Sequence, residues 1–109
     1  MFGLVVRFDL HPEQVEAFDE LVSDTVESIC RFEPGTLAYV CSKVQGAPYS
    51  RVFMEIYRDQ RAFEAHNAYE HVERFLSRRE AMIADVRVEF LDPYEFKFNP
   101  DQTSKSARG

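Results

Sequence analysis

The chain has 109 residues, 45% of them hydrophobic and 14% aromatic, a composition typical of one packed domain and not of a disordered chain. Its formal net charge of −6 argues against nucleic acid or an anionic membrane as the main partner. No apolar run approaches the roughly 18 residues of a membrane span, and the start lacks the pattern of an export signal, so we expect a cytoplasmic protein. Cys30 and Cys41 fall on different predicted elements without metal-ligand spacing, which favours two reduced thiols.

The first predicted elements are a strand over residues 2–9 and a helix over residues 12–32. One face of the strand is wholly apolar and the other half apolar, so neither looks fully solvated. Pro12 suits the first turn of the helix, and Glu33-Pro34-Gly35 ends it, because the residue before a proline is pushed out of helical space. The apolar stripe of the helix contains Val15, Phe18, Val22, Val26 and Ile29, with Leu21 and Thr25 at its edge.

Residues 36–44 and 49–58 predict two strands joined by a short turn, which makes them an antiparallel hairpin. The second of these strands has one plainly apolar face, formed by Val52, Met54 and Ile56. Its other face mixes two rings with two opposite charges: Arg51, Phe53, Glu55 and Tyr57.

A second helical pattern starts at Asp59, which can cap it, and runs to about Asp85 with a break near residues 67–70. Its later part carries a stripe of Val72, Phe75, Leu76, Met82 and Ile83. A fourth strand is predicted over residues 86–91, and alternation resumes over residues 94–98 beyond Pro93. Residues 99–109 are expected to form a disordered tail, which leaves one domain over residues 1–98.

This order of elements predicts an α+β fold of the ferredoxin-like, split βαβ type, with a four-stranded antiparallel sheet and helices on one face. We expect the uncovered face to carry Val5, Leu37 or Ala38, Phe53, Tyr57 and one side of the last strand. An apolar patch of that extent marks a partner surface, and a homodimer that pairs the two open faces would cover it, with residues 94–98 reaching across. The alternative is a monomer whose second face is semi-polar.

Two sequence stretches resemble the antibiotic biosynthesis monooxygenase family over about residues 2–97. Glu33-Pro34-Gly35-Thr36-Leu37-Ala38-Tyr39 is similar to the family's helix-to-strand junction. The spacing of Glu55, Tyr57, Asp59, Ala62, Phe63, His66 and His71 is similar to its signature over the third strand and the following helix.

The resemblance implies a dimeric α+β barrel. Members of the family include cofactor-independent oxygenases of quinols and aromatic polyketides, an isomerase of a phosphorylated signal molecule and haem-degrading oxygenases. This chain has no tryptophan, and Tyr57 stands where the signature often has one, which disfavours the haem-degrading reaction although His66 or His71 could ligate iron.

A cofactor-free oxygenase needs a base near neutral pH, a group that holds the substrate anion and an aromatic wall. Histidine is the natural base. We therefore predict a catalytic set of His66, His71, Asn67 and Tyr57, and a substrate-binding set of Arg51, Phe53, Glu55, Phe63, Phe75 and Tyr39, with no metal or cofactor. The predicted partners are a small aromatic molecule, molecular oxygen and a second copy of the chain.

Each of these residues also has a purely structural interpretation. His66 could be a core histidine bonded to a carbonyl, and His71 could be an exposed residue near a helix start. Arg51 and Glu55 could form a salt bridge at a dimer interface, and Phe63 and Phe75 could be core residues. Two other functions stay open, an isomerase or other acid–base enzyme and a non-catalytic binding module.

Overall fold

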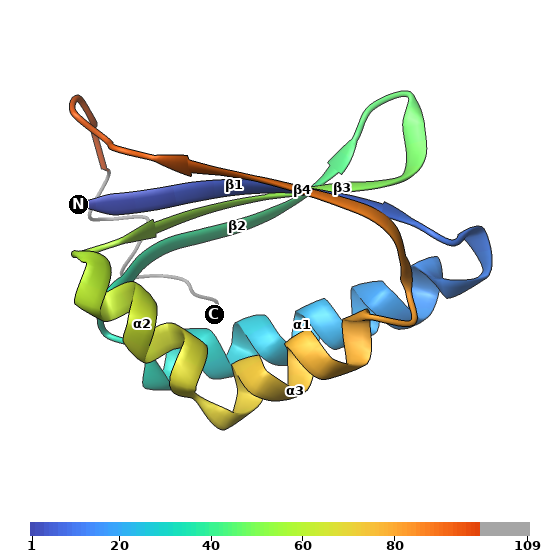
Figure 1. The fold of residues 1–109 in the computed structure, drawn as a ribbon, viewed down its shortest axis with the longest axis horizontal. Coiled ribbons are helices and arrows are strands. Elements are labelled where there is room, and N and C mark those ends of the chain that lie inside the picture. The colour runs from blue at the N-terminus through green and yellow to red at the C-terminus, as the bar shows by residue number, and fades with distance from the viewer. Residues whose placement is uncertain (99–109) are drawn as a thin grey trace.

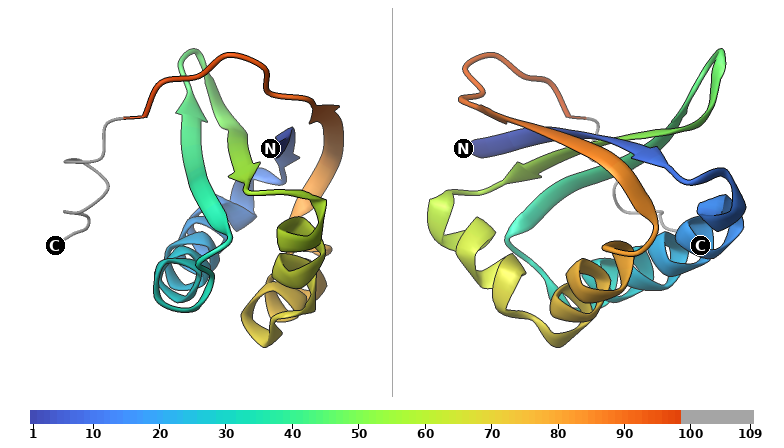
Figure 2. Two further views of the ribbon diagram at one scale, coloured as in Figure 1. Left: turned by 90° about the vertical axis from the view of Figure 1, so that its left-hand side faces the viewer. Right: turned by 45° about the vertical axis from the view of Figure 1, so that its right-hand side comes forward.

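The computed structural model describes residues 1–98, which form a four-stranded sheet covered on one face by helices (Figure 1). The two views of Figure 2 show α1 beside the α2–α3 pair, both on the same side of the sheet. The elements are β1 (Phe2–Leu10), a 3-10 turn (Pro12–Gln14), α1 (Val15–Phe32), β2 (Thr36–Val44), β3 (Ala47–Tyr57), α2 (Gln60–Ala68), α3 (Glu70–Arg79) and β4 (Ile83–Leu91).

The strand order is β2-β3-β1-β4, and every neighbouring pair is antiparallel. β1 and β3 are therefore central, and β2 and β4 are the edges. This topology confirms the predicted ferredoxin-like α+β fold. The hairpin and the helix break were also correctly predicted, because Tyr69 separates α2 from α3 in an extended conformation.

The core lies between the sheet and the helices. β1 contributes every second residue, Leu4, Val6, Phe8 and Leu10, as its alternation predicts. From α1 the buried residues are Phe18, Leu21, Thr25 and Ile29, so Leu21 and Thr25 lie at the centre of the stripe and not at its edge.

The prediction that Phe53 and Tyr57 of β3 lie on the uncovered face of the sheet was wrong. Phe53 and Tyr57 are almost completely buried beneath the helices, because the register places Val6 opposite Phe53 and Phe2 opposite Tyr57. The uncovered face instead carries Val5, Met54 and Val40, which lie side by side across three strands. A buried face can carry the charges of β3 because each charged side chain finds a hydrogen-bonding partner there.

The end of the chain also differs from the prediction. α3 ends at Arg79, so Met82 lies in the connection and Ile83 begins β4 instead of continuing a helical stripe. The predicted strand over residues 94–98 does not form. Residues 92–98 are irregular and cross one end of the sheet in the left view of Figure 2, with Tyr94 88% exposed. The predicted tail at residues 99–109 lies outside the described part of the chain.

Candidate active site

The turn between α1 and β2 lies directly against α2. Glu33 caps the end of α1, and its N–H bonds to the carbonyl of Ile29. A Cβ at Gly35 would lie 2.7 Å from the Cβ of Ala62 on α2, a distance that carbon atoms do not tolerate. Glycine therefore permits this close approach, which brings the Glu33 side chain beside the histidines of the α2–α3 pair.

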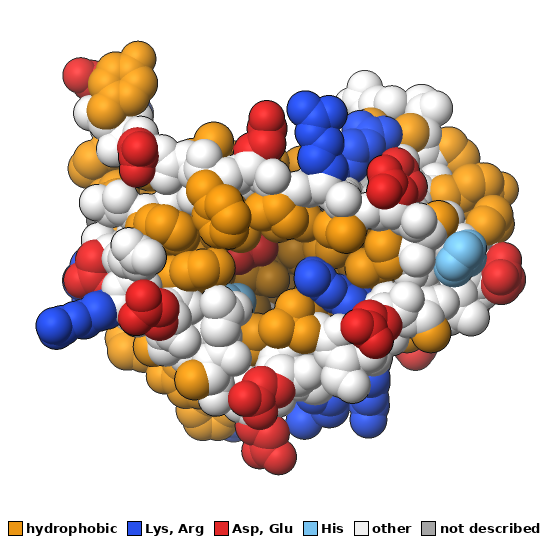
Figure 3. Space-filling view, in the orientation of Figure 1, with side chains coloured by type: hydrophobic (Ala, Val, Ile, Leu, Met, Phe, Trp, Pro, Cys, Tyr) orange, Lys and Arg blue, Asp and Glu red, His pale blue; other side chains and the backbone are white. Residues whose placement is uncertain are grey.

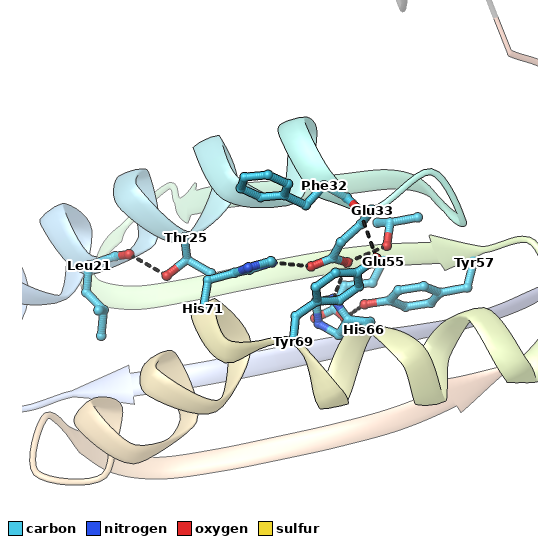
Figure 4. Close-up of polar contacts among 10 residues, drawn as sticks. Leu21, Thr25, Phe32, Glu33, Glu55, Tyr57, His66, Tyr69 and His71 are labelled. Carbon is cyan, nitrogen blue, oxygen red and sulfur yellow. Dashed lines mark hydrogen bonds and ion pairs between the residues drawn. The ribbon is translucent and has the colours of Figure 1, made fainter.

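Glu33 holds two histidines and a threonine (Figure 4). Its Oε1 lies 2.6 Å from Nδ1 of His66 and accepts a hydrogen bond of 2.7 Å from Oγ1 of Thr36. Its Oε2 lies 2.5 Å from Nε2 of His71. Burial raises the pKa of Glu33, but the hydrogen bonds from His66, Thr36 and His71 outweigh it, so this pKa lies below the usual carboxyl value.

The ionised state of Glu33 determines how both imidazoles are oriented. A carboxylate only accepts hydrogen bonds, so the ring nitrogen that faces it from each histidine carries a hydrogen. In a neutral imidazole the second nitrogen is then an acceptor. His66 consequently keeps Nε2 as its basic atom, and His71 keeps Nδ1.

A second buried acid lies on β3. The hydroxyl of Tyr57 donates a hydrogen bond of 2.6 Å to Oε1 of Glu55, and both side chains are buried (Figure 4). Burial raises the pKa of Glu55, and the hydrogen bond from Tyr57 only partly offsets this. Burial and the neighbouring Glu55 also raise the pKa of Tyr57, which therefore acts as a neutral donor.

A cavity of about 180 Å³ opens between the sheet and the α2–α3 pair. Figure 3 shows a hollow between these layers, walled by hydrophobic side chains, with acidic, basic and histidine side chains within it. Its polar lining consists of Tyr39, Glu55, His66, Asn67 and Arg79, and its apolar lining of Leu4, Val6, Phe63, Val72, Phe75, Leu76, Val88 and Phe90. Burial raises the pKa of Tyr39 well above its usual value, so this phenol is also a neutral group.

Six of the ten predicted site residues line this cavity together: Tyr39, Glu55, Phe63, His66, Asn67 and Phe75. Tyr57 lies behind them, with its ring centre 5.2 Å from that of His66. Phe53 packs against Tyr39 and Phe75 in the core. His71 is buried, not exposed, and contacts the site through Glu33.

Arg51 lies away from this cavity. Its Nε and Nη2 donate to the carboxylate of Asp19 on α1 at 2.9 and 2.8 Å, and its Nη1 donates to the carbonyls of Pro48 and Ser50. It lines a separate hollow of about 250 Å³ between α1 and β2–β3. The alternative of a dimer-interface salt bridge between Arg51 and Glu55 was wrong, because both are buried beneath the helices and have other partners.

Two polar residues of the site were missed. Glu33 was interpreted as part of the helix stop and of the stretch that resembles the family's helix-to-strand junction, but no role in the site was predicted for it. That stretch was the available signal, and the burial of the carboxylate is visible only in the structure. Arg79 was not considered, although its spacing of seven, four and three residues from Val72, Phe75 and Leu76 places it on the apolar stripe of α3, whereas Arg78 is exposed beside that stripe. Both belong to the site through contacts between distant parts of the chain.

Within residues 1–98, no group of three His, Cys, Asp or Glu side chains is arranged to hold a metal ion. No helix in this part of the chain is long and apolar enough to cross a membrane.

Comparison with solved structures finds the same fold repeatedly. A protein described as an antibiotic biosynthesis monooxygenase is 29% identical with a TM-score of 0.79, covering 87% of this chain and 100% of its own. PA3566 from Pseudomonas aeruginosa is 26% identical with a TM-score of 0.78, covering 86% of this chain and 94% of its own. Rv0793 from Mycobacterium tuberculosis, at 21% identity and a TM-score of 0.79, covers 87% and 96% and supports the fold alone.

No curated protein matches the chain significantly. The family model described as antibiotic biosynthesis monooxygenase matches residues 1–78, which include Glu33 and both histidines that it holds. The chain therefore belongs to the antibiotic biosynthesis monooxygenase family.

Proposed function

We propose that this protein is a cofactor-independent monooxygenase of a quinol or a polycyclic, polyketide-like aromatic compound. The observation that carries the proposal is the position of His66, which is fixed by a buried carboxylate and lines a largely apolar cavity that includes the rings of Phe63 and Phe75. Family membership supports monooxygenase-like chemistry. We also propose a cytoplasmic location, because reduced thiols such as those of Cys30 and Cys41 are stable there.

The first step is removal of a hydroxyl proton from the substrate by Nε2 of His66. Glu33 stabilises the resulting imidazolium through Nδ1–H, as carboxylates do beside catalytic histidines. Tyr39 and Asn67 hydrogen bond to the anion, and Phe63 and Phe75 pack against its ring. His66 is buried and Tyr39 is partly buried, which strengthens their electrostatic interactions with the anion.

The substrate anion then supplies the electrons that reduce oxygen. It forms a carbon–oxygen bond to O₂, and the proton held by His66 converts the resulting peroxide anion to a hydroperoxide. Cleavage of the O–O bond, with loss of the hydrogen on the same carbon, releases water and leaves a carbonyl. One oxygen atom enters the product and the other leaves as water, so the reaction balances without an added reductant.

The test is oxygen consumption by the purified protein on a panel of hydroquinones and anthrones, without flavin and with a chelator present. We expect turnover that His66→Ala reduces roughly 10²-fold or more. His11→Ala is the matched control, because His11 is exposed at the start of the 3-10 turn. Unchanged turnover in His66→Ala would refute the assigned base.

An acid–base isomerase is the second candidate, favoured by the pairing of His66 with buried Glu55 in one cavity. Such an enzyme would transform its substrate equally well without oxygen, whereas the monooxygenase would not. A binding module would retain the ligand unchanged under both conditions. Anaerobic incubation with product analysis therefore separates all three functions.

We also infer that the uncovered sheet face binds a second copy of the chain. Val40 and Met54 are each 46% exposed there, and Val5 and Val52 adjoin them. Arg7 and Arg87 lie on the same face as Asp9 and Glu89, so the surface can match its own charges in a two-fold pair. In the segment after β4, Tyr94, Phe96 and Phe98 are exposed as well.

Light scattering after size exclusion tests this pairing. The wild type should have the mass of a dimer, and Met54→Glu should shift it toward the monomer. Glu64→Lys, on the exposed side of α2, serves as the control that leaves the mass unchanged. A monomeric wild type would exclude the homodimer.

A further inference from the structure

Arg79, the last residue of α3, projects its guanidinium group over two core rings. The guanidinium carbon lies 5.2 Å from the ring centre of Phe8 and 5.5 Å from that of Phe75. Contacts of this kind are attractive and fix a cation over the ring faces. Arg79 is half-buried and lines the same cavity as His66 and Glu55.

The donors of Arg79 have no protein acceptor within the described residues. No side chain or carbonyl of residues 1–98 is hydrogen bonded to its guanidinium, and no carboxylate lies within ion-pairing distance. The titratable groups near enough to influence the pKa of Arg79 are Tyr39, Glu55 and Glu80. Burial lowers the pKa of Arg79, but a guanidinium stays charged in proteins.

Arg51 is an arginine of the same chain whose guanidinium has a full set of protein hydrogen-bond partners, and it serves as a comparison for Arg79. Its Nε, Nη1 and Nη2 all donate to protein acceptors, namely the carboxylate of Asp19 and two carbonyls. Arg79 has a comparable charge beside a cavity and none of these partners. A partly desolvated cation that the protein leaves without an acceptor is suited to an acceptor brought by the ligand.

We propose that Arg79 binds a carboxylate group of the aromatic substrate, which makes the substrate a hydroxylated aromatic acid. This inference rests on the proposed function and narrows its substrate class. The planar fork of a guanidinium matches the two oxygens of a carboxylate. A carboxylate also carries a single negative charge, whereas a phosphate dianion would bring more charge toward buried Glu55.

The binding test compares 2,5-dihydroxybenzoate with its methyl ester under anaerobic conditions, by calorimetry at one pH and ionic strength. The two probes share the ring and both hydroxyls and differ in the negative charge. We expect the wild type to bind the acid at least roughly tenfold more tightly than the ester, as a charge-assisted hydrogen bond to a buried partner predicts. Equal affinities, or no preference for the acid, would overturn the proposal.

Three variants locate the preference. Arg79→Gln should abolish the preference for the acid over the ester. Arg79→Lys should retain part of this preference, because lysine keeps the positive charge but lacks the planar guanidinium that can bind both carboxylate oxygens. Arg78→Gln removes the same charge from the exposed neighbouring position and should keep the full preference. A preference for the acid that persists in Arg79→Gln would assign the anion to another residue and refute the proposal. Circular dichroism melts confirm that each variant is folded before it is titrated.

This binding readout is independent of oxygen chemistry. If the acid binds preferentially through Arg79 but no dihydroxy-aromatic compound consumes oxygen, the anion subsite stands and the monooxygenase activity fails. If oxygen is consumed but acid and ester are turned over with equal kcat/KM, the activity stands and the role of Arg79 fails.

Discussion

Nδ1 of His66 lies 2.6 Å from Oε1 of Glu33, across a separation of 33 positions in the chain. The Glu33 side chain is 2% exposed, and its second oxygen is held by His71. One buried carboxylate thereby orients two imidazoles, of which only His66 lines the cavity. The chemistry of the site consequently depends on a residue that does not itself line the cavity.

Replacing Glu33 by glutamine should reduce catalysis through His66. An amide offers one acceptor oxygen and one donor nitrogen, so it cannot accept from both imidazoles, and one of them must change its tautomer. We expect kcat to fall roughly 10²-fold or more, with a smaller change in KM. Glu27→Gln, an exposed change on α1, is the matched control. Equal loss in both variants would contradict a positioning role.

His71 should matter more for stability than for rate. His71→Ala leaves one oxygen of Glu33 without its donor and opens a void behind the site, at a cost of about 1–3 kcal/mol in the free energy of unfolding. Its effect on kcat should be smaller than that of His66→Ala, because His71 does not line the cavity. Urea unfolding and steady-state kinetics of the two variants check this order, and a larger kcat loss in His71→Ala would reverse the assignment.

Glu55 should make stability depend on pH in the direction opposite to most carboxyl groups. Because burial raises its pKa in the folded state, the folded protein binds this proton more readily than the unfolded chain does. The penalty of the buried charge is therefore present above the folded pKa and is lost as pH falls through it. Glu55→Gln should raise the melting temperature by several degrees at pH 8 and by less at pH 5. If the gain in melting temperature of Glu55→Gln over the wild type were larger at pH 5 than at pH 8, the raised pKa of Glu55 would be contradicted.

Gly35 should be required for the contact between Glu33 and α2. An added Cβ would meet the Cβ of Ala62 at 2.7 Å, so Gly35→Ala must push the turn away from the helix that carries His66. We expect a loss of about 1–3 kcal/mol in stability together with a lower kcat. Gly46→Ala is the control, because Gly46 has a φ of 81° in a hairpin turn with open space around it. That variant should lose about 1 kcal/mol in stability without a change in kcat.

The sequence by itself determined the local elements and the fold class. The alternation of β1, the break before Pro34, the cap at Asp59 and the interruption near Tyr69 all depend on neighbouring residues, whose propensities act over a few positions. Together with the order of elements they were sufficient to predict the ferredoxin-like sheet. The family was predicted from the resemblance of two stretches, residues 33–39 and residues 55–71, to its motifs. They also singled out His66, Asn67 and Tyr39, which do meet in one cavity.

Only the tertiary structure decided which face of β3 is buried and which charged groups reach the site. Pattern alone favoured the apolar face of Val52, Met54 and Ile56 as core, yet pairing with β1 places Phe53 and Glu55 under the helices. Glu33 and Arg79 reach the site, and Arg51 does not, because close approach at Gly35 and the path of α3 bring distant side chains together. Such contacts depend on strand register and helix packing, which no local period specifies.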